Sequence, residues 1–451
     1  MASPLDKARG LCEAGRLDDA WDLCESILAE NPNHAASLTL VAYIGFKANK
    51  HVTGYTFGKR ALDVAPHEAL AWLNLGINAN ALWRMEESET ALKTAVRLAQ
   101  SKEIRGMAYM NLSGLCIDFG RFQEAEQHAR AALKEVPMSA KSKANLGFAL
   151  LGQRKWEGWD YYSWSLGLRM REKMKFAEEP DWDGTLGQIV AFYGEQGLGD
   201  ELSFSSMLPD AIRDCKKVIF SCDKKLEGLF RRSFPKAKVY GTRKAKAEDG
   251  VVWDEDDREI DASLALGELG CLYRKTDESF NGEPYLVADP DRRRMWRALF
   301  DSKRKPCIGI AWTGGIEMTG QKFRTLSLEQ LKPLLNCMDV HWVSLQYKDA
   351  SREIKDFKKA NPSIDVVQYP GATLTPDYDD TAAMVAELDL VIAIQTAVAH
   401  LAGGLGKECW VMLPKNSQWR YGQSGDTMPF YKSLKVFRQR ALMDWIGPLG
   451  E

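Results

Sequence analysis

The sequence predicts an α + α/β chain, in which a helical repeat solenoid precedes two doubly wound lobes. A helical pattern recurs about every 34 residues in the first third of the 451 residues. Beyond about residue 180, short apolar runs alternate with helical stretches, and they fall into two sets that separate near residue 303. Repeats of this period build solenoids, whereas apolar runs that alternate with helices build parallel sheets.

The repeats are expected to occupy residues 1–170. Pro32 and Pro66 lie 34 residues apart, and each closes a helical stretch. The asparagine-leucine pairs that begin at Asn74, Asn111 and Asn145 are spaced by 37 and then by 34 residues. This pattern resembles tetratricopeptide repeats, which are pairs of antiparallel helices. We expect four repeats and a degenerate fifth, with an insertion before Asn111 that accounts for the spacing of 37.

Small residues recur at one position of the repeat, namely at Ala20, Gly54, Ser88 and Ala125. Small side chains allow two antiparallel helices to approach closely, as a helical hairpin requires. We therefore expect these residues at contacts between helices, and we expect the repeats to contain no strand.

The α/β part is expected to form a first lobe over residues 180–303 and a second lobe over 304–451. The apolar runs expected to be strands begin at Ile189, Val218, Cys307, Trp342, Leu390 and Cys409. A charged, irregular passage from Asp289 to Pro306 is expected to join the lobes, and the last helix, around Trp445, is expected to pack toward the first lobe. Ligands of such folds bind at the carboxyl ends of strands, so the cleft between the lobes is the expected site.

Composition narrows the class of protein. The chain is 45% hydrophobic and 27% charged, which is ordinary for a folded soluble protein, and its net charge of -2 gives no reason to expect nucleic acid as a partner. Nine cysteines lack metal-ligand spacing, so no metal site is expected. The sequence shows neither a signal-peptide core nor a membrane span, which predicts a cytoplasmic location.

The first lobe carries a glycine-rich turn after its first strand, with the sequence GEQGLGDEL from Gly194 to Leu202. Glycines there let the backbone turn tightly into a helix and leave room for a ligand. The pattern is not GxGxxG, which argues against a dehydrogenase. Asp200 is a candidate general base in the cleft, and the alternative is that Asp200 only caps the following helix.

The second lobe begins with a strand that leads into Thr313-Gly314-Gly315, and a basic cluster with Lys322 and Arg324 follows. A basic side chain after the first strand of a nucleotide-binding lobe can neutralise a departing diphosphate. The alternative is that both charges are solvated on a loop.

The strongest pattern runs from Asp379 to Gly406 and reads as helix, strand, polar turn and a helix of small residues. Thr396 can cap that last helix, whose free N–H groups and positive dipole end suit a diphosphate. His400 lies one turn along, where its ring either reaches the site or packs in the core.

Several segments resemble the tetratricopeptide-linked members of glycosyltransferase family 9, which includes the bacterial heptosyltransferases. The segments are EQGLGDELSF, WTGG, KFRTLSL, VSLQ, DDTAAMVAELDLVIAIQTAVAHLAGGLGK and WRYGQSGDTMPFYKSLKVFRQ. The resemblance implies a tetratricopeptide-like solenoid followed by a GT-B fold of two Rossmann-like lobes. It also implies a nucleotide-sugar donor, inversion at the anomeric carbon, and no cofactor or obligate metal.

The resemblance also implies roles for individual residues. The family's catalytic aspartate matches Asp200, and Glu195 on the same turn is the reserve candidate. The acceptor-side loop includes Gly197 and Gly199. The expected donor-side residues are Gly314, Lys322, Arg324, Gln346, Gln395, Thr396, Ala397 and His400. One departure matters, because the family usually has an aspartate where this chain has Gln395.

Three functions remain open at this stage. The first is an active glycosyltransferase whose repeats recruit a protein or peptide acceptor, as repeat solenoids usually bind along a concave face. The second is a non-catalytic repeat adaptor with a silent GT-B module, which Gln395 favours. The third is a transferase that acts on a saccharide or a lipid-linked glycan.

Overall fold

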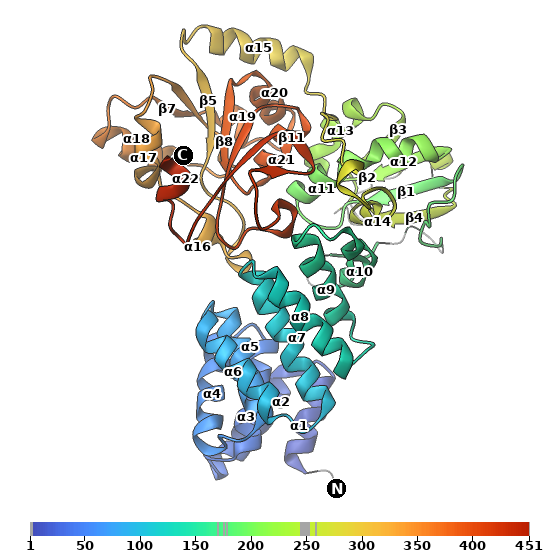
Figure 1. The fold of residues 1–451 in the computed structure, drawn as a ribbon, viewed down its shortest axis with the longest axis vertical. Coiled ribbons are helices and arrows are strands. Elements are labelled where there is room, and N and C mark those ends of the chain that lie inside the picture. The colour runs from blue at the N-terminus through green and yellow to red at the C-terminus, as the bar shows by residue number, and fades with distance from the viewer. Residues whose placement is uncertain are drawn as a thin grey trace. The chain divides into compact units, whose positions relative to one another are not determined.

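A computed structural model describes residues 3–168, 171–174, 176, 179–243, 253–257 and 259–450. The chain divides into two compact units, Met1–Leu150 and Leu151–Glu451. Each unit is described by itself below, and Figure 1 labels the helices and strands of both.

The first unit is a stack of antiparallel helices, as expected, and its described residues contain no strand (Figure 1). The helices are α1 (Pro4–Glu13), α2 (Leu17–Glu30), α3 (Ala35–Lys47), α4 (His51–Val64), α5 (Ala69–Ala81), α6 (Met85–Leu98), α7 (Lys102–Asp118), α8 (Phe122–Glu135) and α9 (Ala140–Gly152). From α1 to α8, each helix contacts the next one in sequence, which is the arrangement of a tetratricopeptide-like repeat.

The small residues of the repeat lie where helices touch, which confirms the prediction. Ala20, Ser88 and Ala125 are fully buried. A Cβ at Gly54 would overlap the side-chain oxygen of Asn78 on the next hairpin, so a larger residue there would force Asn78 to move. The Ser88 hydroxyl donates to the carbonyl of Gly76 at 2.8 Å and so joins the two helices of its hairpin.

The repeated asparagines do not share one role, although they occupy one repeat position. Asn74 is buried and donates to the carbonyl of Thr39 on the previous hairpin at 2.9 Å, and Asn145 donates to Met110 in the same way at 3.0 Å. Asn111 instead donates to Met107 of its own helix at 2.8 Å. Helix α7 has 17 residues where α5 has 13, so the expected insertion lengthens the start of α7.

Residues 156–165, expected to belong to a degenerate fifth repeat, form short helical turns at the start of the second unit. The turns include α10 (Trp159–Tyr162). The indole of Trp159 is fully buried and packs edge-to-face against Tyr162, Phe204 and Trp419. Aromatic packing of this kind anchors the segment to the second unit rather than extending the helix pairs.

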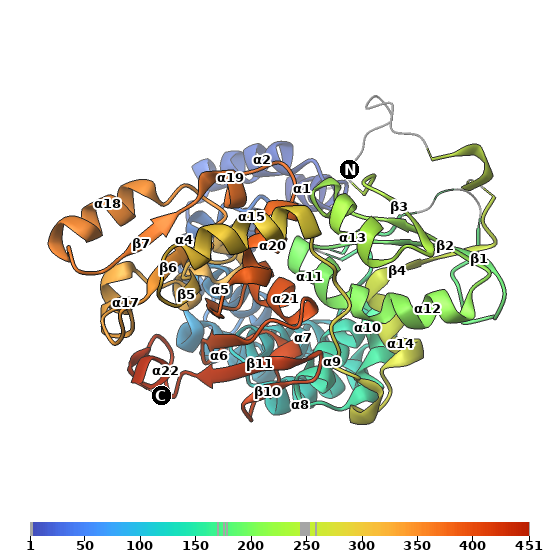
Figure 2. The same cartoon turned by 90° about the horizontal axis from the view of Figure 1, so that it is seen from above.

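The second unit contains two separate sheets (Figures 1 and 2). The first has the order β3-β2-β1-β4, and all its pairs are parallel. Its strands are β1 (Ile189–Tyr193), β2 (Lys217–Ser221), β3 (Ala237–Tyr240) and β4 (Ala262–Ala265). Helices α11 (Leu198–Phe204), α12 (Leu208–Asp214), α13 (Glu227–Ser233) and α14 (Leu269–Tyr273) follow its strands.

The second sheet has the order β10-β11-β9-β8-β5-β6-β7, and only its edge pair β10–β11 is antiparallel among the described strands. Its strands are β5 (Cys307–Ala311), β6 (His341–Ser344), β7 (Val366–Gln368), β8 (Leu390–Ile394), β9 (Cys409–Leu413), β10 (Thr427–Met428) and β11 (Tyr431–Arg438). Its helices are α16 (Gln321–Arg324), α17 (Leu328–Leu335), α18 (Ser351–Ala360), α19 (Pro370–Thr373), α20 (Asp379–Glu387), α21 (Ala397–Gly404) and α22 (Ile446–Gly450).

Two expectations about the connections are wrong. The charged passage after Asp289 is a helix, α15 (Pro290–Asp301), because Asp289 caps it and Arg293 and Arg297 both pair with Glu387 of α20. The last helix does not pack toward the first sheet. Trp445 lies in the hydrophobic core of the second sheet, and α22 contacts α17 and β11, because this core offers the large apolar surface that an indole needs.

Candidate functional site

The glycine-rich turn between β1 and α11 presents Asp200 in the first turn of the helix. One carboxylate oxygen of Asp200 accepts from the backbone N–H of Gly197 at 3.0 Å, so the side chain does cap its helix. The other oxygen accepts from the guanidinium of Arg420 at 2.5 Å. The side chain stays 25% exposed. Asp200 therefore has both the structural contact that its position predicts and a charged partner that the sequence did not indicate.

Arg420 comes from the short 3-10 helix η10 (Trp419–Tyr421), and sequence reasoning missed it. Its guanidinium is buried and lies over the rings of Phe204 and Trp419, at 4.6 and 4.7 Å from their centroids. The only available signal was its place in the segment WRYGQ, since nothing in the spacing separates Arg420 from other arginines. The pair of Arg420 and Asp200 joins the connection between β9 and β10 of the second sheet to the turn after β1 of the first sheet.

The loop after β5 is held by Gln346. Its side-chain oxygen accepts from the backbone N–H groups of Trp312 and Thr313, at 3.3 and 3.2 Å. The next residue, Gly314, lies so close to Thr396 that a Cβ would come within 2.5 Å of the threonine methyl. Gln346 and Gly314 thus shape the loop beside Thr396 through backbone geometry.

Arg324 is buried at the end of α16, and its guanidinium donates to the carbonyl of Thr319 at 2.9 Å and to the Thr319 hydroxyl. Among the described residues, no carboxylate pairs with Arg324, and its Nε has no hydrogen-bond partner. Burial lowers the pKa of Arg324. A buried guanidinium without an anionic partner is costly, and a bound anion would offset that cost. Lys322 is exposed and lies over the ring of Phe323 at 4.9 Å.

Helix α21 begins after Thr396, which stands at the N-cap position. The Thr396 hydroxyl is buried but makes no capping hydrogen bond and has no partner among the described residues. The neighbouring Gln395 is occupied, because its side-chain oxygen accepts from the backbone N–H of Gln418 at 3.1 Å. Helices α11 and α21 touch at Gly199, where a Cβ would lie 3.3 Å from the Cα of Ala397.

His400 is buried on α21, and its Nδ1 lies 3.2 Å from the hydroxyl of Tyr431. Burial, with a smaller contribution from Arg420, lowers the pKa of His400 to about 3, so the ring is neutral at physiological pH. His400 is thus close to Gly199, but because the ring is buried there it carries no positive charge.

The reserve candidate Glu195 lies in a buried ion cluster. Arg171 donates to Glu195 at 3.0 Å and to Glu268 at 2.5 Å, and it also donates to the carbonyl of Tyr162. Burial raises the pKa of both glutamates. This cluster ties the segment before β1 to the first sheet, so the geometry gives Glu195 a structural contact. Asp200 follows Gly199, the residue at which α11 touches α21, and stays the candidate base.

Four buried donor groups of the candidate site have no hydrogen-bond partner among the described residues. They are Nε of Arg324, Nε of Arg420, and the hydroxyls of Thr396 and Tyr421. The phenol of Tyr421 is within electrostatic reach of both guanidinium groups and of Asp200. Buried donors normally find a partner, so a set of unused donors on neighbouring elements indicates a site for an oxygen-rich anion.

Within the described ranges, no group of three or more histidine, cysteine or acidic side chains is arranged to hold a metal ion. No helix among the described residues is long and apolar enough to cross a bilayer.

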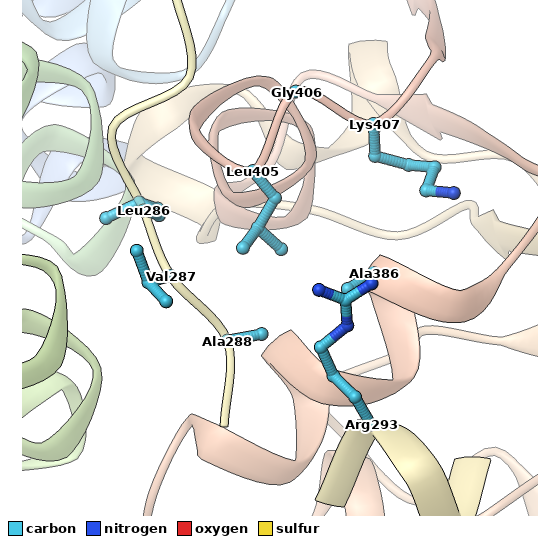
Figure 3. Close-up of a pocket in the computed structure, with 8 residues that line it drawn as sticks. All are labelled: Leu286, Val287, Ala288, Arg293, Ala386, Leu405, Gly406 and Lys407. Carbon is cyan, nitrogen blue, oxygen red and sulfur yellow. The ribbon is translucent and has the colours of Figure 1, made fainter. Parts of the chain in front are cut away.

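A separate cavity of about 370 Å³ lies beside the extended segment 286–288, as Figure 3 shows. Leu405 and Gly406 line it at the end of α21, and the side chains of Arg293 and Lys407 border it. None of its lining residues is a predicted site residue. The cluster around Arg324 and Asp200 is therefore a different place in the second unit.

The chain is similar to a curated bacterial protein. Protein FlbA of Caulobacter vibrioides is 29% identical over 415 residues, which covers 87% of this chain and 67% of that protein. Such coverage includes residues of both units. No protein-family model matches the chain.

Several solved structures match at low similarity. A thermophilic TPR protein, TTC0263 of Thermus thermophilus, is 22% identical and covers 36% of this chain and 89% of its own, with a TM-score of 0.33. The structure of pilF of Pseudomonas aeruginosa is 13% identical, covers 46% of this chain and 84% of its own, and has a TM-score of 0.35. YrrB, described as a TPR protein with an unusual peptide-binding site, is 16% identical, covers 36% of this chain and 83% of its own, and has a TM-score of 0.30.

Proposed function

We propose that the second unit is a glycosyltransferase module of the GT-B kind, which transfers a sugar from a nucleotide-sugar donor to an acceptor hydroxyl. The observation that carries this proposal is the environment of Arg324. Its buried guanidinium has no carboxylate partner among the described residues, and the unused hydroxyl of Thr396 stands at the start of α21. A diphosphate would satisfy both groups and the free N–H groups of the helix.

On the acceptor side, Asp200 is the proposed general base. As the acceptor oxygen bonds to the anomeric carbon, its proton passes to the Asp200 carboxylate, and the bond from the carbon to the leaving phosphate oxygen breaks. Attack from the face opposite the leaving group inverts the anomeric carbon. The departing diphosphate takes the bonding electrons, and Arg324 stabilises its charge. Arg420 supports this step because its ion pair with Asp200 holds the carboxylate in place at the start of α11.

The repeats are proposed to recruit a protein or peptide acceptor. Their helices form a regular stack, and such stacks usually present an extended surface to polypeptides. A saccharide or lipid-linked glycan acceptor would use the same chemistry at Asp200, so the acceptor class is decided by whether the first unit is needed for transfer.

A second candidate, a catalytically silent module on a repeat adaptor, draws on a specific observation. Both carboxylate oxygens of Asp200 are already occupied, by Gly197 and by Arg420, and Gln395 is neutral. If the module is silent, the residues around Arg324 and Asp200 either bind a nucleotide without transferring sugar or bind no nucleotide.

The donor site is tested by nucleotide binding with matched variants. Thermal stability is measured with UDP, GDP, ADP, CMP and dTDP, because a ligand that binds only the native state raises the melting temperature. Arg324→Ala should weaken binding about 10- to 100-fold, since a hydrogen bond to a charged group contributes about 1.5–3 kcal/mol. Lys322→Ala is the control and should bind normally. If Lys322→Ala weakens binding and Arg324→Ala does not, the site is assigned to the wrong residue.

The catalytic step is tested with Asp200→Asn, which keeps the size of the side chain and its contact with Gly197. Nucleotide binding should survive, and turnover should fall by roughly 100- to 10,000-fold, as is typical when a general base is lost. Transfer at the wild-type rate would reduce Asp200 to a helix cap. Nucleotide binding without any turnover in the wild type would favour the silent adaptor.

A further inference from the structure

The side chains of His400, Tyr431 and Tyr285 form a hydrogen-bonded relay that ends at a backbone carbonyl of α11. His400 Nδ1 lies 3.2 Å from the Tyr431 hydroxyl, and that hydroxyl lies 3.4 Å from the hydroxyl of Tyr285. The Tyr285 hydroxyl in turn donates to the carbonyl of Leu202 in α11. His400 and Tyr431 are buried, and Tyr285 is half-buried.

The Leu202 carbonyl at the end of this relay sets the direction of every hydrogen bond in the relay. The carbonyl of Leu202 can only accept, so the Tyr285 proton is committed to it. Ser205 donates to the same carbonyl at 2.9 Å, and so it does not reverse the direction. The oxygen of Tyr285 is then free only as an acceptor.

The acceptor of Tyr285 then determines which neighbour receives the Tyr431 proton. If Tyr431 donated to His400, no proton would lie between the two tyrosine oxygens, and their lone pairs would face each other in a buried site. If Tyr431 donates to Tyr285, every pair in the chain contains one proton. His400 Nδ1 must then carry a proton and donate to Tyr431.

We infer that this relay holds His400 as the Nδ1–H tautomer, so that its Nε2 is a bare acceptor for a hydroxyl group of the substrate. The identity of that substrate rests on the proposed function. Among the described residues, nothing hydrogen-bonds to Nε2. The neighbouring ring atom, Cδ2, faces Gly199, which precedes Asp200, so Nε2 lies beside the glycine-rich turn.

The inference changes the role expected for His400. A bare Nε2 cannot donate to a phosphate oxygen, and its lone pair would repel one. A hydroxyl of the sugar or of the acceptor can donate to it. Tyr431 and Tyr285 are therefore positioning residues, because they act on the substrate only through the tautomer of His400.

The tautomer is measured directly by NMR on the full chain with ¹⁵N-labelled histidine, in which His400→Gln identifies the His400 signals. The wild type should show a protonated Nδ1 and an unprotonated Nε2. Tyr285→Phe should move the proton to Nε2, because Tyr431 loses its acceptor and turns its own proton toward Nδ1. Tyr285 does not touch His400, so a change caused only by lost packing would not produce this exchange.

Tyr273→Phe is the matched control, since Tyr273 donates to Asp214 at 2.9 Å and takes no part in the relay. Its His400 signals should equal those of the wild type. A protonated Nε2 in the wild type, or an unchanged tautomer in Tyr285→Phe, would overturn the relay.

Activity separates this inference from the proposed function. Tyr285→Phe should keep its affinity for the nucleotide within about twofold, and kcat should fall at least about tenfold, as for one lost hydrogen bond of about 1.4 kcal/mol. A flipped tautomer with wild-type kcat would overturn the role of Nε2. If the wild type transfers no sugar, the proposed function fails, while the NMR result still decides the relay.

Discussion

Two charged residues of the candidate site differ in how their charge is balanced. The Asp200 carboxylate is matched by Arg420 at 2.5 Å and stays partly exposed. The Arg324 guanidinium is buried, and within the described part of the chain its hydrogen bonds go only to Thr319. An unbalanced buried charge is rare in proteins that do not use it, so Arg324 is the residue at which a ligand is most strongly expected.

The neutral state of His400 predicts a pH dependence of stability. The pKa of His400 is lowered to about 3 in the folded protein, whereas a histidine in the unfolded chain titrates near about 6.5. Between these values the unfolded chain binds the proton and the folded protein does not. Stability contributed by the neutral ring is therefore fully present above pH 6.5 and is lost as the pH falls toward 3.

His400→Gln tests this expectation. Relative to the variant, the wild type should lose up to about 1.4 kcal/mol of unfolding free energy per pH unit below about pH 6. The measurement is urea unfolding of both proteins at pH 7.5, 5.5 and 4.5. Parallel curves at all three values would show that His400 titrates normally in the folded state.

At the scale of elements, the repeats show how one insertion changes the use of one sequence position. Asn74 and Asn145 hydrogen-bond across hairpins, but Asn111 bonds within α7. Asn111 is the asparagine that follows the insertion at the start of α7. The same asparagine therefore joins neighbouring hairpins in two repeats and not in the third.

Matched alanine variants should reveal this difference. Asn74→Ala leaves the carbonyl of Thr39 without its donor in a buried contact and should destabilise the first unit by about 1–3 kcal/mol. Asn111→Ala removes a bond within an exposed helix face and should change stability by less than about 0.5 kcal/mol. Chemical unfolding followed by helical circular dichroism measures both. Equal losses would mean that the repeat position, rather than its contact across hairpins, determines stability.

At the scale of the whole molecule, each unit has its own hydrophobic core. One cluster around Val41 and Ile44 belongs to the first unit, and a cluster around Trp312 and Trp342 belongs to the second. All residues of the proposed nucleotide site, including Arg324, Thr396 and Arg420, lie in the second unit. A nucleotide should therefore stabilise the second unit without help from the first.

Hydrogen exchange on the intact chain checks this division. With nucleotide at about one hundred times its Kd, the second unit should gain about 2.7 kcal/mol of protection, mainly around α16 and α21. Peptides from residues 3–150 should exchange as they do without nucleotide, and Asn74→Ala should leave the gain unchanged. Protection that appears mainly in the repeats would place the nucleotide site in the wrong unit.

The sequence by itself determined the periodic features of this protein. The period of the repeats predicted the helix pairs, and the apolar runs predicted β1, β2, β5, β6, β8 and β9. Such features are readable because period and apolar run length reflect local geometry. The strands β3, β4, β7, β10 and β11 were missed. The first four are short, and polar residues interrupt the apolar ones of β11, so neither kind stands out as an apolar run in the sequence.

Only the tertiary structure decided which side chains meet. The pairing of Asp200 with Arg420 spans 220 positions, and the relay from His400 through Tyr431 to Tyr285 joins segments that no local pattern relates. The burial of Arg324 without a carboxylate is likewise a property of its surroundings and not of its neighbours in the chain. The physical reason is that hydrogen bonds and charge pairs depend on the distance between two groups in space. The residues next to each group in the sequence do not determine that distance.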